Sequence, residues 1–154
     1  MELMVVRHGP AEDRGPDLPD EARSLTPRGR LRMRRVARAL DARGLAVDRL
    51  LHSPLLRAVE TADTLRRLVR GETEVCPGLA GTPDEALLAA LVGERVAVVG
   101  HEPWLGQLVA WLVVGDPGLG ARFPLKKGGV FLLEGAAAPG GMVLRSAWPP
   151  GTWR

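Results

Sequence analysis

Arg7 and His8 directly follow a short apolar run, Leu3-Met4-Val5-Val6, near the start of the chain. Four apolar residues in a row, two of them β-branched, predict a short buried strand that Gly9 and Pro10 end. In open α/β folds, ligands bind at the carboxyl edge of a parallel sheet, where this strand delivers both side chains. A cation and an imidazole at such an edge suit a phosphate with a nucleophile beside it.

Two later segments repeat this pattern. Residues 48–64 predict a strand, a turn at Ser53-Pro54 and a helix whose first turn contains Arg57. A helix N-terminus attracts anions, and a guanidinium there adds a bidentate phosphate contact. Residues 96–103 predict another buried strand, followed by a glycine and His101. The spacing therefore predicts one phosphate site built from three distant parts of the chain.

These motifs resemble those of the histidine phosphatase (phosphoglycerate mutase-like) superfamily: an N-terminal Arg-His-Gly, a middle Ser-Pro-x-x-Arg-Ala-x-x-Thr-Ala and a late Gly-His. The chain is most similar to the SixA-type phosphohistidine phosphatase branch, over roughly residues 3 to 134. Residues 23–29, Arg-Ser-Leu-Thr-Pro-Arg-Gly, resemble the Arg-x-Leu-Thr-x-x-Gly piece of that branch. The resemblance implies a three-layer α/β/α sandwich with a mainly parallel central sheet.

The resemblance also implies a role for each site residue. His8 attacks phosphorus to form a covalent phosphohistidine intermediate, which water then hydrolyses. Arg7, Arg57 and His101 hold the phosphoryl oxygens and stabilise the developing charge. The two nearby arginines disfavour imidazolium and should keep His8 neutral at physiological pH. Arg23, in the loop after the first strand, and Glu102 are candidates for substrate contact.

A metal site is the alternative use of the three histidines, because His8, His52 and His101 all end predicted strands. Arginines beside a zinc ion would be repelled by it, and the family that the chain resembles is metal-independent. We therefore expect no metal and no cofactor, with His52 in a structural role. Cys76 is the only cysteine and no motif surrounds it, so a structural role is expected for it as well.

The substrate is predicted from what residues 75–81 lack. Many relatives that cleave phosphate esters carry a carboxylic acid here to protonate the leaving group, and this stretch has none. The absence favours phosphohistidine in a protein, such as a phosphotransfer domain, and a role in signal transduction. The alternative is a phosphomonoesterase that acts on a small metabolite. In that case the leaving group takes its proton from Glu12, Asp13 or Glu102. A non-catalytic phosphate-binding module is the third reading, although it would need no nucleophile at His8.

Composition favours one domain over residues 1–154, with a net charge of +3 and 45% hydrophobic residues. No apolar segment approaches the ~20 residues that span a bilayer, and no signal peptide precedes the first strand. The expected location is the cytoplasm, with no membrane partner. Arginines cover a broad arc of the helix after Thr26 without aromatic neighbours, which favours a solvated face over nucleic-acid binding and leaves docking of an acidic protein open.

The spacing of apolar residues and turn signals predicts the remaining elements. A helix begins at Pro27 after the Thr26 cap and ends before Gly44. The helix of residues 103–114 is apolar almost all round, so it is either deeply buried or part of a self-association surface. The other expected elements are a helix over 55–70, a strand over 73–76, a helix to about Val92, a strand over 95–100 and a hairpin of strands 130–134 and 142–147.

Overall fold

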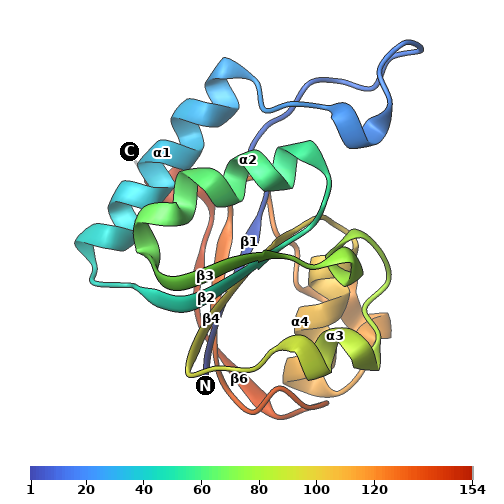
Figure 1. Cartoon of the computed structure of the whole chain (residues 1–154). Coiled ribbons are helices and arrows are strands. Elements are labelled where there is room, and N and C mark those ends of the chain that lie inside the picture. Colours follow the sequence, from blue (N-terminus) through green and yellow to red (C-terminus); the bar gives the residue numbers. More distant parts are fainter. Residues whose placement is uncertain (154) are drawn as a thin grey trace.

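The computed structural model describes residues 1–153, and a six-stranded sheet in the order β3-β2-β4-β1-β5-β6 forms its centre (Figure 1). Strands β3, β2, β4 and β1 run parallel, whereas β5 pairs antiparallel with both β1 and β6. The predicted mainly parallel sheet is therefore confirmed. The strands span Glu2–Arg7 (β1), Val47–His52 (β2), Val69–Val75 (β3), Arg95–Gly100 (β4), Val130–Gly135 (β5) and Met142–Trp148 (β6).

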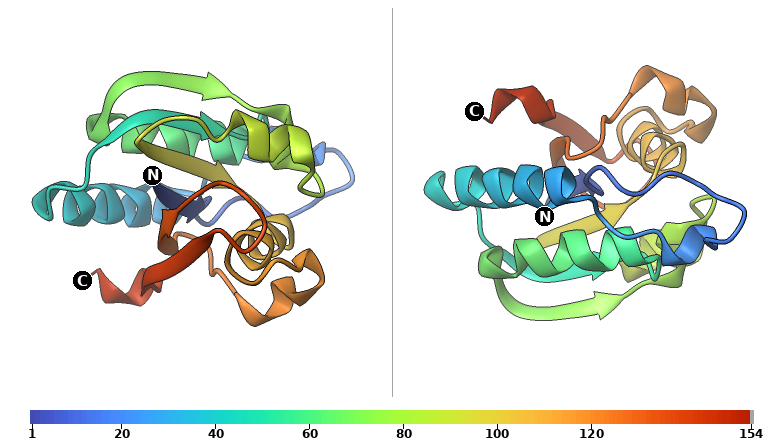
Figure 2. Two further views of the ribbon diagram at one scale, coloured as in Figure 1. Left: turned by 90° about the horizontal axis from the view of Figure 1, so that it is seen from below. Right: turned by 90° about the horizontal axis from the view of Figure 1, so that it is seen from above.

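Helices cover both faces of the sheet, as the two views of Figure 2 show. Helices α1 (Pro27–Ala42) and α2 (Leu56–Thr64) pack on one face, and α3 (Glu85–Ala90) and α4 (Trp104–Val114) pack on the other. Successive strand residues point to opposite faces, so Val5 joins the core beneath α3 and α4. Its neighbour Val6 joins the core beneath α1 and α2. The three-layer α/β/α sandwich is confirmed.

Helix α1 begins as its sequence predicts. The Thr26 hydroxyl accepts a hydrogen bond from the Gly29 backbone N–H at 3.0 Å, and Pro27 occupies the first helical position. The apolar stripe of the helix is fully buried against the sheet. A Cβ on Gly29 would overlap the carbonyl oxygen of Pro10, so this glycine lets the helix start lie directly against the loop after β1. The buried stripe consists of Met33, Val36, Ala37 and Leu40.

The expected helix over 55–70 is too long. Helix α2 ends at Thr64, a 3₁₀ helix (η2) covers Leu65–Leu68, and β3 begins at Val69 rather than at residue 73. Leu65 and Leu68 are both buried, and a spacing of three residues suits a 3₁₀ turn as well as an α-helix. Strand β3 then forms an edge of the sheet, with most of its residues exposed.

Helix α4 is buried, which is one of the two arrangements that its apolar sequence predicts. Its residues pack against the sheet and against a 3₁₀ helix, η4 (Pro117–Arg122), which follows it in the chain. Gly115, at a φ of 77°, ends α4 in the left-handed conformation that glycine adopts most easily. Within residues 1–153, no helix is long and apolar enough to cross a membrane.

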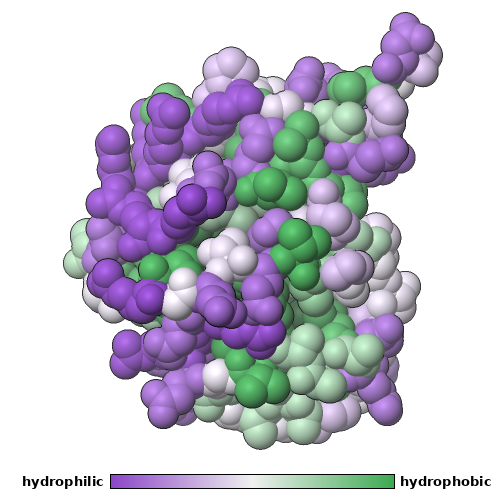
Figure 3. All heavy atoms as spheres, viewed as in Figure 1, coloured by the Kyte–Doolittle hydropathy of each residue, from purple (hydrophilic) through white to green (hydrophobic). Residues whose placement is uncertain are grey.

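The C-terminal hairpin forms as predicted, with β5 and β6 antiparallel. The chain then returns to the α1 side, where the Trp153 ring lies 4.6 Å beneath the guanidinium of Arg43. Several α1 arginines are exposed, and Figure 3 shows hydrophilic side chains gathered over this part of the surface. The arginines of α1 thus lie at the surface, and the exposed ones are Arg28, Arg34, Arg35 and Arg38.

Candidate active site

The predicted site residues follow the ends of three neighbouring parallel strands, β2, β4 and β1. Arg7 is the last residue of β1, and His8 comes next; His101 follows β4; and Arg57 lies in the first turn of α2, after β2. The backbone N–H of His8 donates to the carbonyl of Gly100 at 3.1 Å, which ties the end of β1 to the end of β4. The fold thus brings these four side chains to one edge of the sheet.

His8 is held with one ring nitrogen free. Its side chain is buried, and Nδ1 lies 2.7 Å from the carbonyl oxygen of Gly9. Since a carbonyl only accepts, Nδ1 carries the ring proton and Nε2 has an unshared electron pair. Burial, and then the charges of His101, Arg57 and Arg7, lower the pKa of His8 to about 3. The ring is therefore neutral at physiological pH, as predicted, with Nε2 as its nucleophilic atom.

The His101 ring lies 5.0 Å from that of His8, centroid to centroid. Its Nε2 is 2.7 Å from the hydroxyl oxygen of buried Ser53, which also accepts the backbone N–H of Leu55. When the Ser53 hydroxyl donates to Nε2, the proton of the neutral ring is on Nδ1. Burial and then the charge of Arg57 lower the pKa of His101 to about 4. Ser53 thereby fixes the orientation of the neutral His101 ring.

Both predicted arginines are fixed by hydrogen bonds at their outer nitrogens. Arg57 is buried, and its Nη1 and Nη2 donate to the backbone oxygen and the carboxylate of Asp20 at 2.8 and 3.2 Å. Arg7 donates through Nη1 to the carbonyl of Leu125 at 2.9 Å. Burial lowers the pKa of each guanidinium, which nonetheless stays protonated. Each arginine thus holds its Nε toward the interior.

Unpartnered polar atoms concentrate at this site. In residues 1–153, five buried side-chain nitrogens and oxygens have no hydrogen-bond partner. Three of them are Nε of Arg7, Nε of Arg57 and Nδ1 of His101; the other two belong to Gln107 and Trp153. A buried donor without an acceptor costs about 1–3 kcal/mol, so native proteins rarely keep several together. Two guanidiniums and the His101 ring, all near His8, suit a tetrahedral oxyanion.

Arg23 lies beside this group. Its Nε donates to the backbone oxygen of Glu12 at 2.6 Å, and its Nη1 donates to the carboxylate of Asp20 at 2.8 Å. Asp20 joins Arg23 to Arg57, because both guanidiniums contact its carboxylate. Glu12 is exposed and its carboxylate accepts the backbone N–H of Ser24, which ties it to its own loop. The Arg23 side chain therefore lies at the edge of the site, whereas the Glu12 carboxylate contacts its own loop instead of the site.

Glu102, the other candidate for substrate contact, lies beside Arg7. Its carboxylate accepts the backbone N–H of Gly106 at 2.8 Å, at the start of α4. Burial raises the pKa of Glu102, although this hydrogen bond and the charge of Arg7 oppose the rise. In turn, the charge of Glu102 favours the protonated form of Arg7. The carboxyl thus supports Arg7 electrostatically from the α4 side.

Sequence reasoning missed three residues that hold the site together: Asp20, Ser53 and Thr61. The Thr61 hydroxyl accepts the backbone N–H of Gly9 at 3.1 Å and donates to the carbonyl of Arg57 at 2.8 Å. It therefore joins the loop after His8 to helix α2. Ser53 and Thr61 belong to the Ser-Pro-x-x-Arg-Ala-x-x-Thr-Ala motif, which contained the signal for them. Asp20 lies in a polar loop without apolar periodicity and had no such signal.

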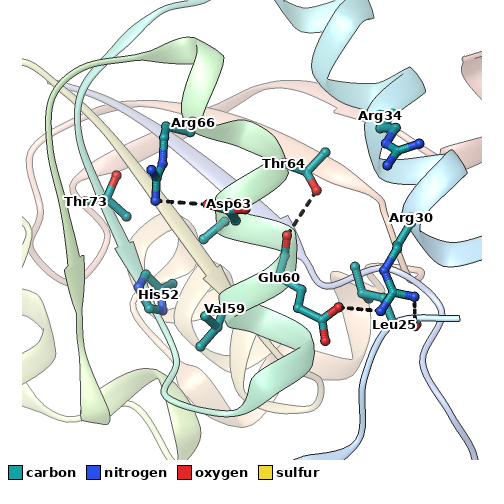
Figure 4. Close-up of a pocket in the computed structure, with 11 residues that line it drawn as sticks. Leu25, Arg30, Arg34, His52, Val59, Glu60, Asp63, Thr64, Arg66 and Thr73 are labelled. Carbon is teal, nitrogen blue, oxygen red and sulfur yellow. Dashed lines mark hydrogen bonds and ion pairs between the residues drawn. The ribbon is translucent and has the colours of Figure 1, made fainter. Parts of the chain in front are cut away.

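His52 lies apart from the site, as expected. Its Nδ1 is 2.9 Å from its neighbour's carbonyl oxygen, that of Ser53, and the ring lines a shallow hollow along α2 (Figure 4). Two ion pairs border that hollow, and none of the four predicted catalytic side chains lines it. Residues 1–153 contain no group of three His, Cys, Asp or Glu side chains arranged to bind a metal ion. The two ion pairs are Arg30–Glu60 and Arg66–Asp63.

Solved structures of other phosphatases share the fold of this chain. A structure of the protein histidine phosphatase SixA complexed with tungstate superposes with a TM-score of 0.83, at 25% identity, over 100% of both chains. A phosphoserine phosphatase of Entamoeba histolytica, in complex with 3-phosphoglyceric acid, has the same fold, with a TM-score of 0.73 at 19% identity over 96% of each chain. The phosphoglycerate mutase-like architecture is therefore confirmed.

Comparison of sequences identifies the family. An uncharacterized protein of Picosynechococcus is 36% identical over 148 residues, covering 90% of this chain and 87% of its own. The phosphohistidine phosphatase SixA of Escherichia coli is 34% identical over 125 residues, covering 75% of this chain and 76% of its own. The model of the histidine phosphatase superfamily (branch 1) matches residues 3–81, which include the Arg-His-Gly and the Ser-Pro-x-x-Arg motifs. The chain belongs to the histidine phosphatase superfamily.

Proposed function

We propose that this protein removes phosphate from phosphohistidine in other proteins. The observation that carries the proposal is that His8, with Nε2 free, lies near Arg7, Arg57 and His101, each of which has an unpartnered buried nitrogen. A nucleophile and donors around one point are what phosphoryl transfer requires. Similarity to SixA of Escherichia coli, a phosphohistidine phosphatase, supports the choice of substrate.

The proposed reaction has two displacements at phosphorus. In the first, the electron pair on Nε2 of His8 forms a bond to phosphorus, the phosphorus–nitrogen bond of the substrate breaks, and its pair stays on the departing imidazole. In the second, water attacks the phosphoryl group on His8, the bond to Nε2 breaks, and phosphate leaves. Arg7, Arg57 and His101 neutralise the equatorial oxygens in both steps. The Gly9 carbonyl holds the proton on Nδ1 throughout.

The leaving group distinguishes this substrate from a phosphate ester. Residues 77–80 form a 3₁₀ helix (η3), and the segment 75–81 around it contains no carboxylate that could protonate an alkoxide. An imidazole that is protonated on its distal nitrogen departs as a neutral ring and needs no such acid. The segment therefore favours a phosphoramidate over an ester.

A small phosphomonoester is the second candidate substrate, and Glu102 is the observation that favours it. Burial raises the pKa of this carboxyl beside Arg7, so it holds a proton to a higher pH than an exposed glutamate does. Such a group can act as a general acid for an alkoxide. Under this alternative, E102Q would lower ester hydrolysis far more than the cleavage of phosphohistidine.

The test measures phosphate release from a histidine-phosphorylated phosphotransfer domain and from p-nitrophenyl phosphate, both with EDTA present. We expect rapid release from the protein, slow release from the ester, and a loss of at least about 10³-fold in H8N. The variant H52N, which changes a buried histidine outside the site, serves as the matched control. Normal turnover by H8N would refute the nucleophile, and a preference for the ester would refute the substrate. Activity lost with EDTA and restored by a metal ion would refute the metal-independent mechanism.

A further inference from the structure

Asp20 lies where two buried guanidiniums meet solvent. It begins the 3₁₀ helix η1 (Asp20–Ala22), which lies beside α2 in the loop between β1 and α1 (Figure 2, right). Its carboxylate contacts Arg57 at 3.2 Å, Arg23 at 2.8 Å and Arg14 at 3.4 Å. The Asp20 side chain is 39% exposed, against 6% for Arg57 and 10% for Arg23. The carboxylate therefore forms the outer rim of the arginine group.

This contact fixes which part of Arg57 faces the reaction. Both terminal nitrogens of Arg57 point outward to Asp20, and the unpartnered Nε remains on the inner side. A phosphoryl group bound at that Nε would have Asp20 across the same guanidinium, on the solvent side. His8 is only 4% exposed, whereas the Asp20 side chain is 39% exposed, so the nucleophile is the deeper of the two groups. An in-line displacement then sends the leaving group toward solvent, where Asp20 lies.

The charge of Asp20 suits an acceptor rather than an acid. The hydrogen bond from Arg23 lowers the pKa of Asp20, burial opposes this, and the charge and hydrogen bond of Arg57 lower it further. The carboxylate is therefore ionised at physiological pH and has no proton to give to an alkoxide. It can accept a hydrogen bond from the cationic ring of a distally protonated phosphohistidine, before that ring departs as neutral imidazole.

We propose that Asp20 accepts a hydrogen bond from the distal ring N–H of the substrate's phosphohistidine, and so selects a nitrogen leaving group over an oxygen one. This inference rests on the proposed function. With phosphorus on one ring nitrogen and a proton on the other, the substrate ring is a cation before it is cleaved. When His8 attacks, the pair of the breaking phosphorus–nitrogen bond stays on the departing nitrogen, and a neutral imidazole leaves with its N–H still facing Asp20. An alkoxide has no such N–H, and its negative charge would face the carboxylate.

The test compares D20N with the wild type on 1-phosphoimidazole and on p-nitrophenyl phosphate, with kcat and KM measured for each. The amide side chain of D20N would keep a hydrogen-bonding group but remove the charge. We expect kcat/KM for 1-phosphoimidazole to fall at least about 10-fold relative to that for the ester, as for loss of one charge-assisted hydrogen bond. The variant D17N, which changes an exposed carboxylate in the same loop, should leave the ratio unchanged.

The possible results distinguish recognition of the leaving group by Asp20 from a purely positioning role. An equal fall on both substrates in D20N would overturn the proposal, because Asp20 would then act only by positioning Arg57 and Arg23. If D20N does not fold, D20E keeps the charge but moves it by one methylene, and the ratio must again fall. A wild-type protein that does not cleave 1-phosphoimidazole or phosphohistidine would refute the proposed function itself. An unchanged ratio in an active D20N refutes only the role of Asp20.

Discussion

Replacing His8 by Asn is expected to flatten the dependence of the free energy of unfolding on pH. Burial and neighbouring charges lower the pKa of His8 to about 3 and that of His101 to about 4, from an ordinary value of 6.5. Below 6.5 the unfolded chain therefore binds a proton at each histidine that the folded chain does not. The stability present above pH 6.5 is lost as the pH falls toward the folded pKa values.

The magnitude follows from these two values. Each histidine lowers the free energy of unfolding by about 1.4 kcal/mol for each pH unit below 6.5. Two units of acidification cost about 2.7 kcal/mol for His8 and a similar amount for His101, or about 5 kcal/mol together. A domain of this size has a stability of about 5–15 kcal/mol, so the loss should be large. The raised pKa of Glu102 opposes it, equally in wild type and variant.

The measurement is urea denaturation at a series of pH values between about 4.5 and 7. The wild type should lose about 2.7 kcal/mol per pH unit before the Glu102 correction, H8N and H101N about 1.4 less, and the double variant should lose both contributions. Asn at position 8 keeps an N–H that can donate to the Gly9 carbonyl, so the loop retains its hydrogen bond. The same slope in H8N and in the wild type would refute the view that the folded site excludes a proton.

Two further changes test how the site is held together. T61V removes the acceptor of the Gly9 N–H and should cost about 1–3 kcal/mol in thermal denaturation, whereas T61S keeps the hydroxyl; equal stability of the two would contradict the role of that hydrogen bond. G29A places a methyl group against the Pro10 carbonyl and should cost about 1–3 kcal/mol, whereas G15A meets open space; an unchanged melting temperature in G29A would show that the loop shifts freely.

The catalytic side chains were easier to predict from the sequence than the residues that hold them in place. The strand ends that carry His8 and His101 follow uninterrupted apolar runs, which indicate buried parallel strands without help from the tertiary structure. Arg57 lies off the apolar stripe of its helix, and a helical wheel alone would place it on the surface. The structure buries it because η1 folds over the start of α2 and Asp20 pairs with it. No local pattern specifies that long-range contact.

The α2–β3 boundary shows why the length of a helix is harder to predict. No glycine or proline separates Thr64 from Val69, so the sequence contains no stop signal where the helix ends. Pairing of β3 with β2 from Val69 to Val75 fixes the boundary instead. The hydrogen bonds and burial gained along this pairing outweigh the weak local preference for helix.

The exposed edge strand β3 has a consequence for how the protein behaves at high concentration. A flat, apolar edge would offer its free backbone groups to another chain and promote aggregation. Here Arg70, Glu72 and Glu74 place charges along the edge, and the register with β2 shifts between Val47 and Arg49. Gly71 packs against the Asp48 carbonyl at that irregularity. Charge and irregular pairing together resist strand addition, so the sheet needs no covering element on this side.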